Sequence, residues 1–181
     1  MNKTQVNLLI KRCIYEPRKY KGCEPDSVKK KKDLIFCIDF FGREEFDNNL
    51  VESLISDSIT NKNEEEFDLL LTLLEHFKNT KNFDLILAEL LIQPWHHFHD
   101  RIATILEFDK NEDTIEFLCK GAFYRCDNLE YESDYCSFNR KCIYALAKIG
   151  TPEALNCIEK ISASNKPIIS NYAEYILKNI V

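Results

Sequence analysis

The chain has 181 residues, 45% hydrophobic and 30% charged, a balance that suits one globular core or one compact array of repeats. Four glycines and five prolines are too few for the turns of a β sandwich, so helices joined by short connections are favoured. The net charge of −6 disfavours nucleic acid as a partner, because nucleic-acid binding usually needs a basic surface.

Eight cysteines are present, but none forms a CxxC pair or a zinc-finger spacing. The first residues lack the apolar core of a signal peptide, and no apolar run reaches membrane-spanning length. We therefore expect a cytosolic protein with free thiols and no membrane partner. Cys119, Cys142 and Cys157 fall on apolar helical stripes and are expected to be small core residues.

The first half of the chain has the less regular pattern. Residues 6–15 predict a first helix, and residues 16–28, which contain two prolines and a glycine, predict a loop. The apolar stretch 29–41 suits a helix or a strand. Further helices are expected over residues 43–59, 64–77 and 82–92, the last two forming a pair around a short turn at residues 79–81.

In the second half, apolar residues recur at i, i+3, i+4 and i+7, which is one face of an amphipathic helix. Such stripes begin at Ile115, Cys142, Ala154 and Ile169. The breaks between them carry helix-end signals. Gly150 suits the left-handed position just past a helix, and Thr151, Pro152 and Glu153 suit an N-cap, a first-turn proline and a first-turn acid. Residues 111–113 and 165–167 predict two further helix starts.

The stripes also repeat along the chain. The apolar set at Ile102, Ile105 and Leu106 recurs 40 residues later from Cys142, and the set from Ile115 recurs 39 residues later from Ala154. A helix pair with this period is typical of HEAT and armadillo arrays, which bury their apolar faces by stacking. We therefore expect an all-α, HEAT-like α-solenoid of stacked antiparallel helix pairs, with about 8–9 helices. Residues 1–181 are expected to form one domain, with divergent helices over 1–62 and helix-pair repeats over 63–181.

The stretch PWHHFHDR, residues 94–101, holds the only tryptophan and three of the four histidines. If Pro94 opens a helix, His96, His99 and Asp100 share one face, at a spacing that could hold zinc. The remaining ligands are missing, since the only other histidine is His76 and the HExxH order is absent. We therefore expect no metal site.

The simplest interpretation of this stretch is a packed helix start. Trp95 would lie against the neighbouring helix, with Phe98, Ile102 and Leu106 continuing a buried stripe. His99 or His96 would then be a partly buried side chain with satisfied hydrogen bonds. The alternative is that His96 and His97 point outward at a ligand surface.

The sequence carries no pattern that places a catalytic nucleophile, such as a serine elbow or a glycine-rich phosphate loop. Cys126 and Cys136 lie among acids, which disfavour the reactive thiolate. We expect no enzymatic activity, no catalytic residues, no cofactor and no small-molecule substrate.

The segment RCDNLEYESDYCSF, residues 125–138, interrupts the helical periodicity. Its four acids can be a solvated connection. Tyr131 and Tyr135 among those acids also suit a binding surface, in which the rings supply contact area and the acids steer a partner. A long connection in an otherwise economical repeat costs ordering entropy, which favours a function there.

Residues 85–178 resemble a family of bacterial HEAT-repeat proteins. The resemblance lies in a Trp-His start followed by a His-acid pair, and in the acidic aromatic segment that runs into RKCIYALAKIGTPEA, residues 140–154. Members of the family are often associated with polymorphic-toxin loci and with immunity. Here an extra histidine, His97, and an aspartate, Asp100, where a glutamate is expected, depart from the family pattern.

The resemblance implies a cytosolic immunity protein that binds and neutralises a cognate toxin by protein–protein contact, without chemistry of its own. The acids of residues 125–138 would steer a basic toxin, such as a nuclease. The alternative is a HEAT-repeat scaffold in a host complex without a toxin. The residues that we expect to contact the partner are Trp95, His96, His99, Asp100, Asp127, Glu130, Tyr131, Glu132, Asp134, Tyr135 and Arg140.

Overall fold

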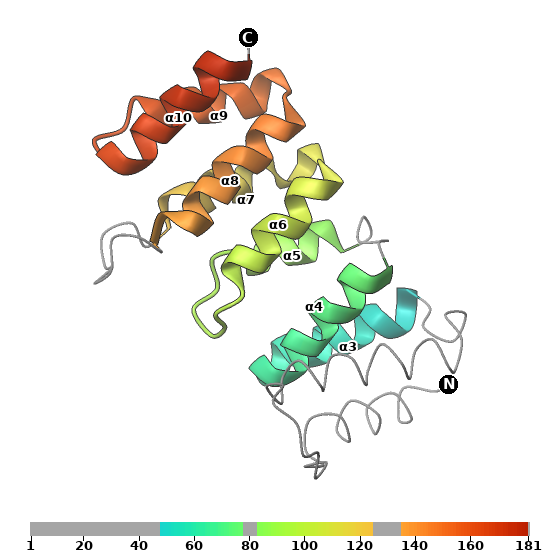
Figure 1. Cartoon of the computed structure of the whole chain (residues 1–181). Helices are drawn as coiled ribbons and strands as arrows, with labels where there is room; N and C mark the ends of the chain where they lie inside the picture. The colour runs from blue at the N-terminus through green and yellow to red at the C-terminus, as the bar shows by residue number, and fades with distance from the viewer. Residues whose placement is uncertain (1–47, 78–82, 125–134, 181) are drawn as a thin grey trace, which may run out of the picture. The chain divides into compact units, whose positions relative to one another are not determined.

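Figure 1 shows the chain as a computed structural model, which describes residues 48–77, 83–124 and 135–180. The regular elements of these residues are eight α-helices and one short 3-10 helix, and they include no strand. The predicted all-α fold class is therefore confirmed. The chain divides into two compact units, Met1–Asn79 and Thr80–Val181, which are taken in turn. The predictions for residues 6–15, 16–28 and 29–41 lie outside the described residues.

In the first unit, α3 (Asn48–Asn61) packs against α4 (Glu64–Phe77). Lys62 ends α3 in a left-handed conformation with a φ of 50°. Asn63 begins α4, because its Oδ1 accepts a hydrogen bond from the backbone N–H of Glu66 at 3.3 Å. α4 pairs with α3, to which this two-residue connection joins it. The predicted pairing of residues 64–77 with residues 82–92 joins residues of the two units and stays a prediction.

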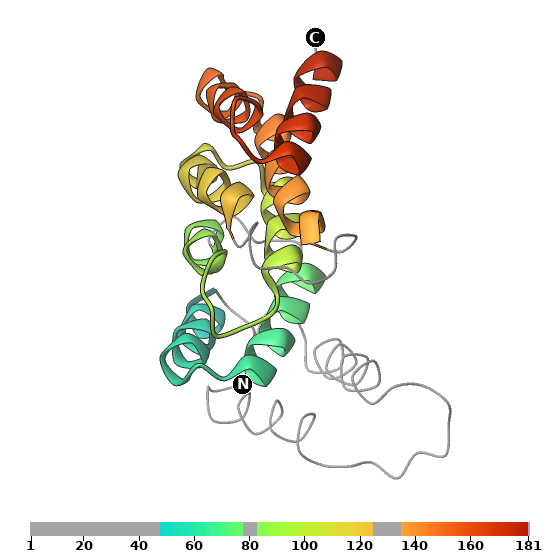
Figure 2. The ribbon, with the colours of Figure 1, turned by 90° about the vertical axis from the view of Figure 1, so that its left-hand side faces the viewer.

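The second unit contains three helix pairs. They are α5 (Asp84–Leu90) with α6 (His99–Asp109), α7 (Ile115–Phe123) with α8 (Tyr135–Ile149), and α9 (Pro152–Ser162) with α10 (Pro167–Ile180). The 3-10 helix η2 (Glu112–Thr114) precedes α7. Figure 2 shows α5, α7 and α9 in one row and α6, α8 and α10 in a second row, and neighbours within each row are also in contact. This arrangement confirms the predicted stack of helix pairs, and it is solenoid-like.

The core of the second unit lies between the two rows and is made from the predicted apolar stripes. Five predicted core members differ, because they are only half-buried: Ile115, Cys119, Ile149, Cys157 and Tyr172. Each lies at the edge of its stripe, where a helix surface turns from the core toward solvent. The fully buried side chains include Leu87, Leu91, Ile102, Leu106, Leu118, Ala122, Cys142, Leu146, Ile158 and Ala173.

The predicted break between α8 and α9 is confirmed. Gly150 has a φ of 71°, the left-handed conformation that favours glycine. Thr151 Oγ1 accepts from the backbone N–H of Ala154 at 3.4 Å, and Pro152 is the first residue of α9. The end of α6 uses the same left-handed geometry without a glycine, since Lys110 has a φ of 52°.

Gly121 in α7 sits where three elements converge. A Cβ built at this position would lie 2.9 Å from Cys142 Sγ and 2.9 Å from Leu91 Cδ2. It would also lie 3.3 Å from Phe138 Cζ. Because ordinary carbon contacts need more room, the missing side chain lets α7 approach α8 and the end of α5 closely.

We predict that Gly121→Ala lowers the free energy of unfolding by about 1–2 kcal/mol, although alanine is the better helix former, because overpacking outweighs propensity. Lys110→Gly should raise the free energy of unfolding by about 0.5–1 kcal/mol, because glycine adopts the left-handed conformation of residue 110 without strain. Urea unfolding followed by circular dichroism measures both. A stabilising Gly121→Ala would show that α7 and α8 are not in such close contact.

Candidate functional site

His96 is a buried capping residue and does not lie on a helix face. Residues 91–98 form a connection, and α6 begins at His99, not at Pro94 as the sequence suggested. His96 is only 1% exposed. Its Nε2 lies 3.0 Å from the carbonyl oxygen of Leu90, the last residue of α5, and its Nδ1 accepts from the backbone N–H of Phe98 at 3.2 Å. Since Nδ1 is the acceptor, the proton of the neutral ring is on Nε2 and is donated to Leu90.

His99 caps the same end of α5. Its Nδ1 lies 2.9 Å from the carbonyl oxygen of Leu91 and donates to it. The centroids of the His96 and His99 rings are 4.7 Å apart. The His99 ring also lies 5.4 Å from the ring of Tyr124, just past α7, and 5.6 Å from that of Phe138, in the first turn of α8. One histidine therefore joins the ends of α5, α7 and α8.

These contacts show that His96 and His99 bind backbone groups. A zinc site would need nitrogens of His96 and His99 and the Asp100 carboxylate to converge on one point. Both nitrogens of His96 instead bond to backbone groups, as does Nδ1 of His99. Within residues 48–77, 83–124 and 135–180, no group of three or more histidine, cysteine or acidic side chains is arranged to hold a metal ion.

Asn139 caps the end of α7, as His96 and His99 cap the end of α5. It is 1% exposed. Its Nδ2 donates to the carbonyl oxygens of Gly121, Ala122 and Tyr124, each at 3.1 Å. The last carbonyls of a helix have no partner within the helix, so a buried helix end needs such a donor. We call His96, His99, Tyr124, Phe138 and Asn139 the helix-end junction.

Asp100 connects the first turn of α6 to the first two turns of α8, beside this junction. Its Oδ1 accepts from Ser137 Oγ at 2.8 Å, and its Oδ2 pairs with Lys141 Nζ. The side chains of Asp100 and Lys141 are 46% and 35% exposed, so solvent limits the ion pair to about 1 kcal/mol or less. Its main effect is to fix the register of α6 against α8 and to neutralise Lys141.

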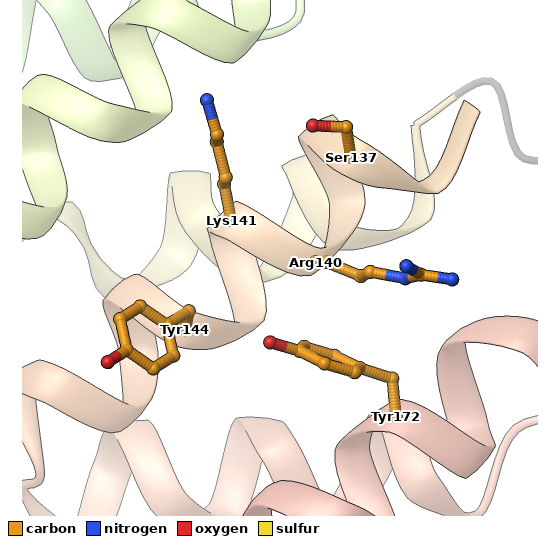
Figure 3. Close-up of a pocket in the computed structure, with 5 residues that line it drawn as sticks. All are labelled: Ser137, Arg140, Lys141, Tyr144 and Tyr172. Atoms are coloured by element: carbon orange, nitrogen blue, oxygen red, sulfur yellow. The ribbon is translucent and has the colours of Figure 1, made fainter. Parts of the chain in front are cut away.

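An open depression of about 290 Å³ lies next to this ion pair. Figure 3 shows Ser137, Arg140, Lys141 and Tyr144 projecting from α8, while Tyr172 reaches toward them from α10. The Arg140 guanidinium lies 5.6 Å from the centroid of the Tyr172 ring, a cation–π contact. The depression therefore combines a cation with aromatic walls.

Aromatic and basic side chains continue from the depression along α8 and α10. Lys148 Nζ lies 5.2 Å from the Tyr144 ring, and the rings of Tyr172 and Tyr175 stack at 6.4 Å. Tyr144 is 39% exposed and Tyr175 is 60% exposed. We call Arg140, Tyr144, Lys148, Tyr172 and Tyr175 the tyrosine surface.

Tyr172 and Arg140 determine the chemistry of the depression, which is that of a phenol beside a cation. Partial burial raises the pKa of the Tyr172 phenol, and the adjacent Arg140 guanidinium works in the opposite direction. Because the net effect is upward, Tyr172 keeps its proton at neutral pH and can donate a hydrogen bond into the depression.

The predicted contact residues fall into four groups. Asp100 lies at the depression and Arg140 lines it, so the structure brings these two together. His96 and His99 belong to the helix-end junction, and Trp95 stands edge-on to His96 with ring centroids 4.9 Å apart. Of Tyr135, only the backbone is described, as the first residue of α8. The remaining predicted residues, Asp127, Glu130, Tyr131, Glu132 and Asp134, lie outside the described residues.

Sequence reasoning missed most of the tyrosine surface. The sequence predicts a core position for Tyr172, and Tyr144 and Tyr175 are not among the predicted contact residues. A signal was present, because Arg140, Tyr144 and Lys148 are spaced by four residues and so share the face of α8 that lies away from its apolar stripe. Asn139 gave no such signal, since a buried capping role depends on where the neighbouring helix ends.

No protein-family model, curated protein or solved structure matches the chain. Among the described helices, none is both long and apolar enough to cross a membrane.

We predict that His96→Ala lowers the free energy of unfolding by about 2–4 kcal/mol, because it leaves a cavity and removes a donor to a buried carbonyl. His96→Gln should recover about 1 kcal/mol, since its amide nitrogen can reach the Leu90 carbonyl. His97→Ala is the matched control, because His97 is exposed, and should change stability by less than about 0.5 kcal/mol.

Hydrogen exchange gives the local readout of the same role. Peptides that cover α5 should lose amide protection in His96→Ala more than peptides that cover α9. Equal protection of α5 in the variant and the native chain would contradict the capping role.

Proposed function

We propose that this chain is a protein-binding helical-repeat module, and that it acts as a cytosolic immunity protein that binds and neutralises a toxin. The observation that carries the proposal is the tyrosine surface with its depression. The family resemblance of residues 85–178 supplies the toxin as the partner class.

The composition of the tyrosine surface supports protein binding. Tyrosine and arginine are the residues most enriched at the energetic centres of protein interfaces, because each offers a large contact area and a directed hydrogen bond. Here the rings and cations are already held against each other, at 5.6 Å for Arg140 and Tyr172 and at 5.2 Å for Lys148 and Tyr144. Side chains ordered in advance lose less entropy when a partner binds.

Helix α8, which carries Arg140, Tyr144 and Lys148, is held by its neighbours, and this also favours binding. Helix α8 contacts α6, α7, α9 and α10, so it is the central element of the second unit. Its side toward α6 is held by the Asp100–Lys141 ion pair and by the bond from Ser137. A partner that docks on α8 therefore meets a surface that need not rearrange.

The charged residues at and just before α8 suit a partner that carries both acidic and basic groups. The Arg140 cation can receive a carboxylate or a carbonyl oxygen of the partner. The acids at positions 127, 130, 132 and 134 immediately precede α8 in the chain and can steer basic groups, such as those of a nuclease toxin. Neutralisation then follows if the partner's active or substrate-binding site is the part that is covered.

A scaffold role in a host complex would use the same surface and differs in its partner. The neighbouring reading frame separates the two functions. A toxin-like domain encoded there, whose expression arrests growth unless this chain is present, supports immunity. A partner from a housekeeping complex, with no protective effect, supports the scaffold.

We predict that Tyr175→Ala and Arg140→Ala each weaken binding to the neighbouring toxin domain by about 10–100-fold, the effect of truncating an interface anchor. Calorimetric titration measures the dissociation constant, and growth of cells that co-express the toxin measures protection. Both side chains are exposed, so the fold should be retained.

Two controls locate the site. Lys160→Glu places a charge change on the other helix row, at an exposed position of α9, and should leave binding unchanged. Changing Asp127, Glu130, Glu132 and Asp134 together to Ala should slow association and reduce its salt dependence, with a smaller effect on dissociation. Toxin binding that survives all tyrosine-surface changes would keep the immunity function but reject this surface.

A further inference from the structure

The other row of helices carries a second feature that protein binding does not use. An open groove of about 610 Å³ runs between α7 and α9. Acidic side chains line it toward the starts of the two helices, and Lys120 and Lys160 line it toward their ends. Cys119 from α7 and Cys157 from α9 are both part of its lining.

The two cysteines are in contact across the groove. Both line the same groove, close enough to share a hydrogen bond, and both side chains are partly buried. Burial, and next the hydrogen bond with Cys157, raise the pKa of Cys119 to about 12. Cys119 therefore holds its proton at neutral pH.

Charged groups of both signs lie around the pair of cysteines. Lys160 lies within one turn of Cys157 on α9, and its ammonium is close enough to act on Cys119. The nearest acid on α7, Glu116, is held by Lys120 at 2.6 Å. Glu153 lies one turn before Cys157 on α9 and also lines the groove. Because Cys119 holds its proton, we assign the first reaction with an oxidant to Cys157, the other sulfur of the pair.

We propose that Cys119 and Cys157 form a peroxide-oxidisable dithiol, whose disulfide clamps α7 to α9 across the groove. The sulfur of Cys157 loses its proton and attacks one oxygen of hydrogen peroxide, and the O–O bond breaks to give a sulfenic acid and a hydroxide that takes up that proton as water. The sulfur of Cys119 then attacks the sulfenic sulfur and releases water. The two thiols lose two hydrogens in total, and the peroxide becomes two waters.

The helix packing permits this bond. Packed helices have axes roughly 8–10 Å apart, with Cα atoms about 2.3 Å from each axis, so facing Cα atoms reach the roughly 4.4–6.8 Å that a disulfide spans. The two sulfurs already share a hydrogen bond, so oxidation requires only a small closure of the groove. The oxidised chain would join two neighbouring helix pairs of the stack covalently.

Treatment of the full chain with one equivalent of hydrogen peroxide tests the proposal. Peptide mapping without reduction should find Cys119 joined to Cys157, and dithiothreitol should reverse the cross-link. Buried Cys142 is the internal control and should stay unmodified. The melting temperature should rise by about 5 °C or more on oxidation, because the bond closes a long loop of the unfolded chain.

The two serine variants assign the roles of the sulfurs. Cys119→Ser should leave Cys157 as a sulfenic acid that dimedone labels, whereas Cys157→Ser should give little label at Cys119. Both variants should lose the shift in melting temperature. The proposal is overturned if both thiols of the native chain remain open to alkylation after peroxide treatment. It is equally overturned if the cross-links are distributed among the cysteines as they are in urea.

Discussion

Short helices that end inside the protein set the main constraint on the second unit. The last carbonyl groups of a helix have no partner within it, and away from water each one needs a donor. α5 has only seven residues, so its open carbonyls are a large share of its backbone. His96 and His99 supply donors there, and Asn139 supplies one at the end of α7. The positions of α6 and α8 follow from these bonds.

The two rows of helices in this unit carry different chemistry. The row of α6, α8 and α10 presents tyrosines and cations around an open depression, which suits contact with another protein. The row of α5, α7 and α9 carries a groove with two facing thiols. Because the apolar core separates the rows, a change on one surface need not alter the other.

Much of the fold could be predicted from the sequence, because periodicity reports directly on helices. The stripes from Ile115 and Ala154 and the turn at Gly150 and Thr151 gave the right elements and the right stacking. The packing of α3 against α4 was not predicted, since periodicity shows that a face is apolar but not which helix covers it.

The candidate site was harder to predict, because it depends on contacts between distant residues. His96 and His99 were expected to be satisfied side chains, yet their acceptors, the carbonyls of Leu90 and Leu91, could not be named before the end of α5 was known. The spacing of Arg140, Tyr144 and Lys148 was visible, but Tyr172 joins them only through the packing of α10 on α8.

The small size of α5 also bears on the order in which the unit folds. Seven residues are too few to nucleate a stable helix alone, since initiation is unfavourable and each added residue contributes little. The fifteen residues of α8 and the fourteen of α10 are better nuclei, and contacts between sequence neighbours let order spread from one pair to the next. α5 would then join after the transition state, so that substitutions in it speed unfolding and leave the folding rate almost unchanged.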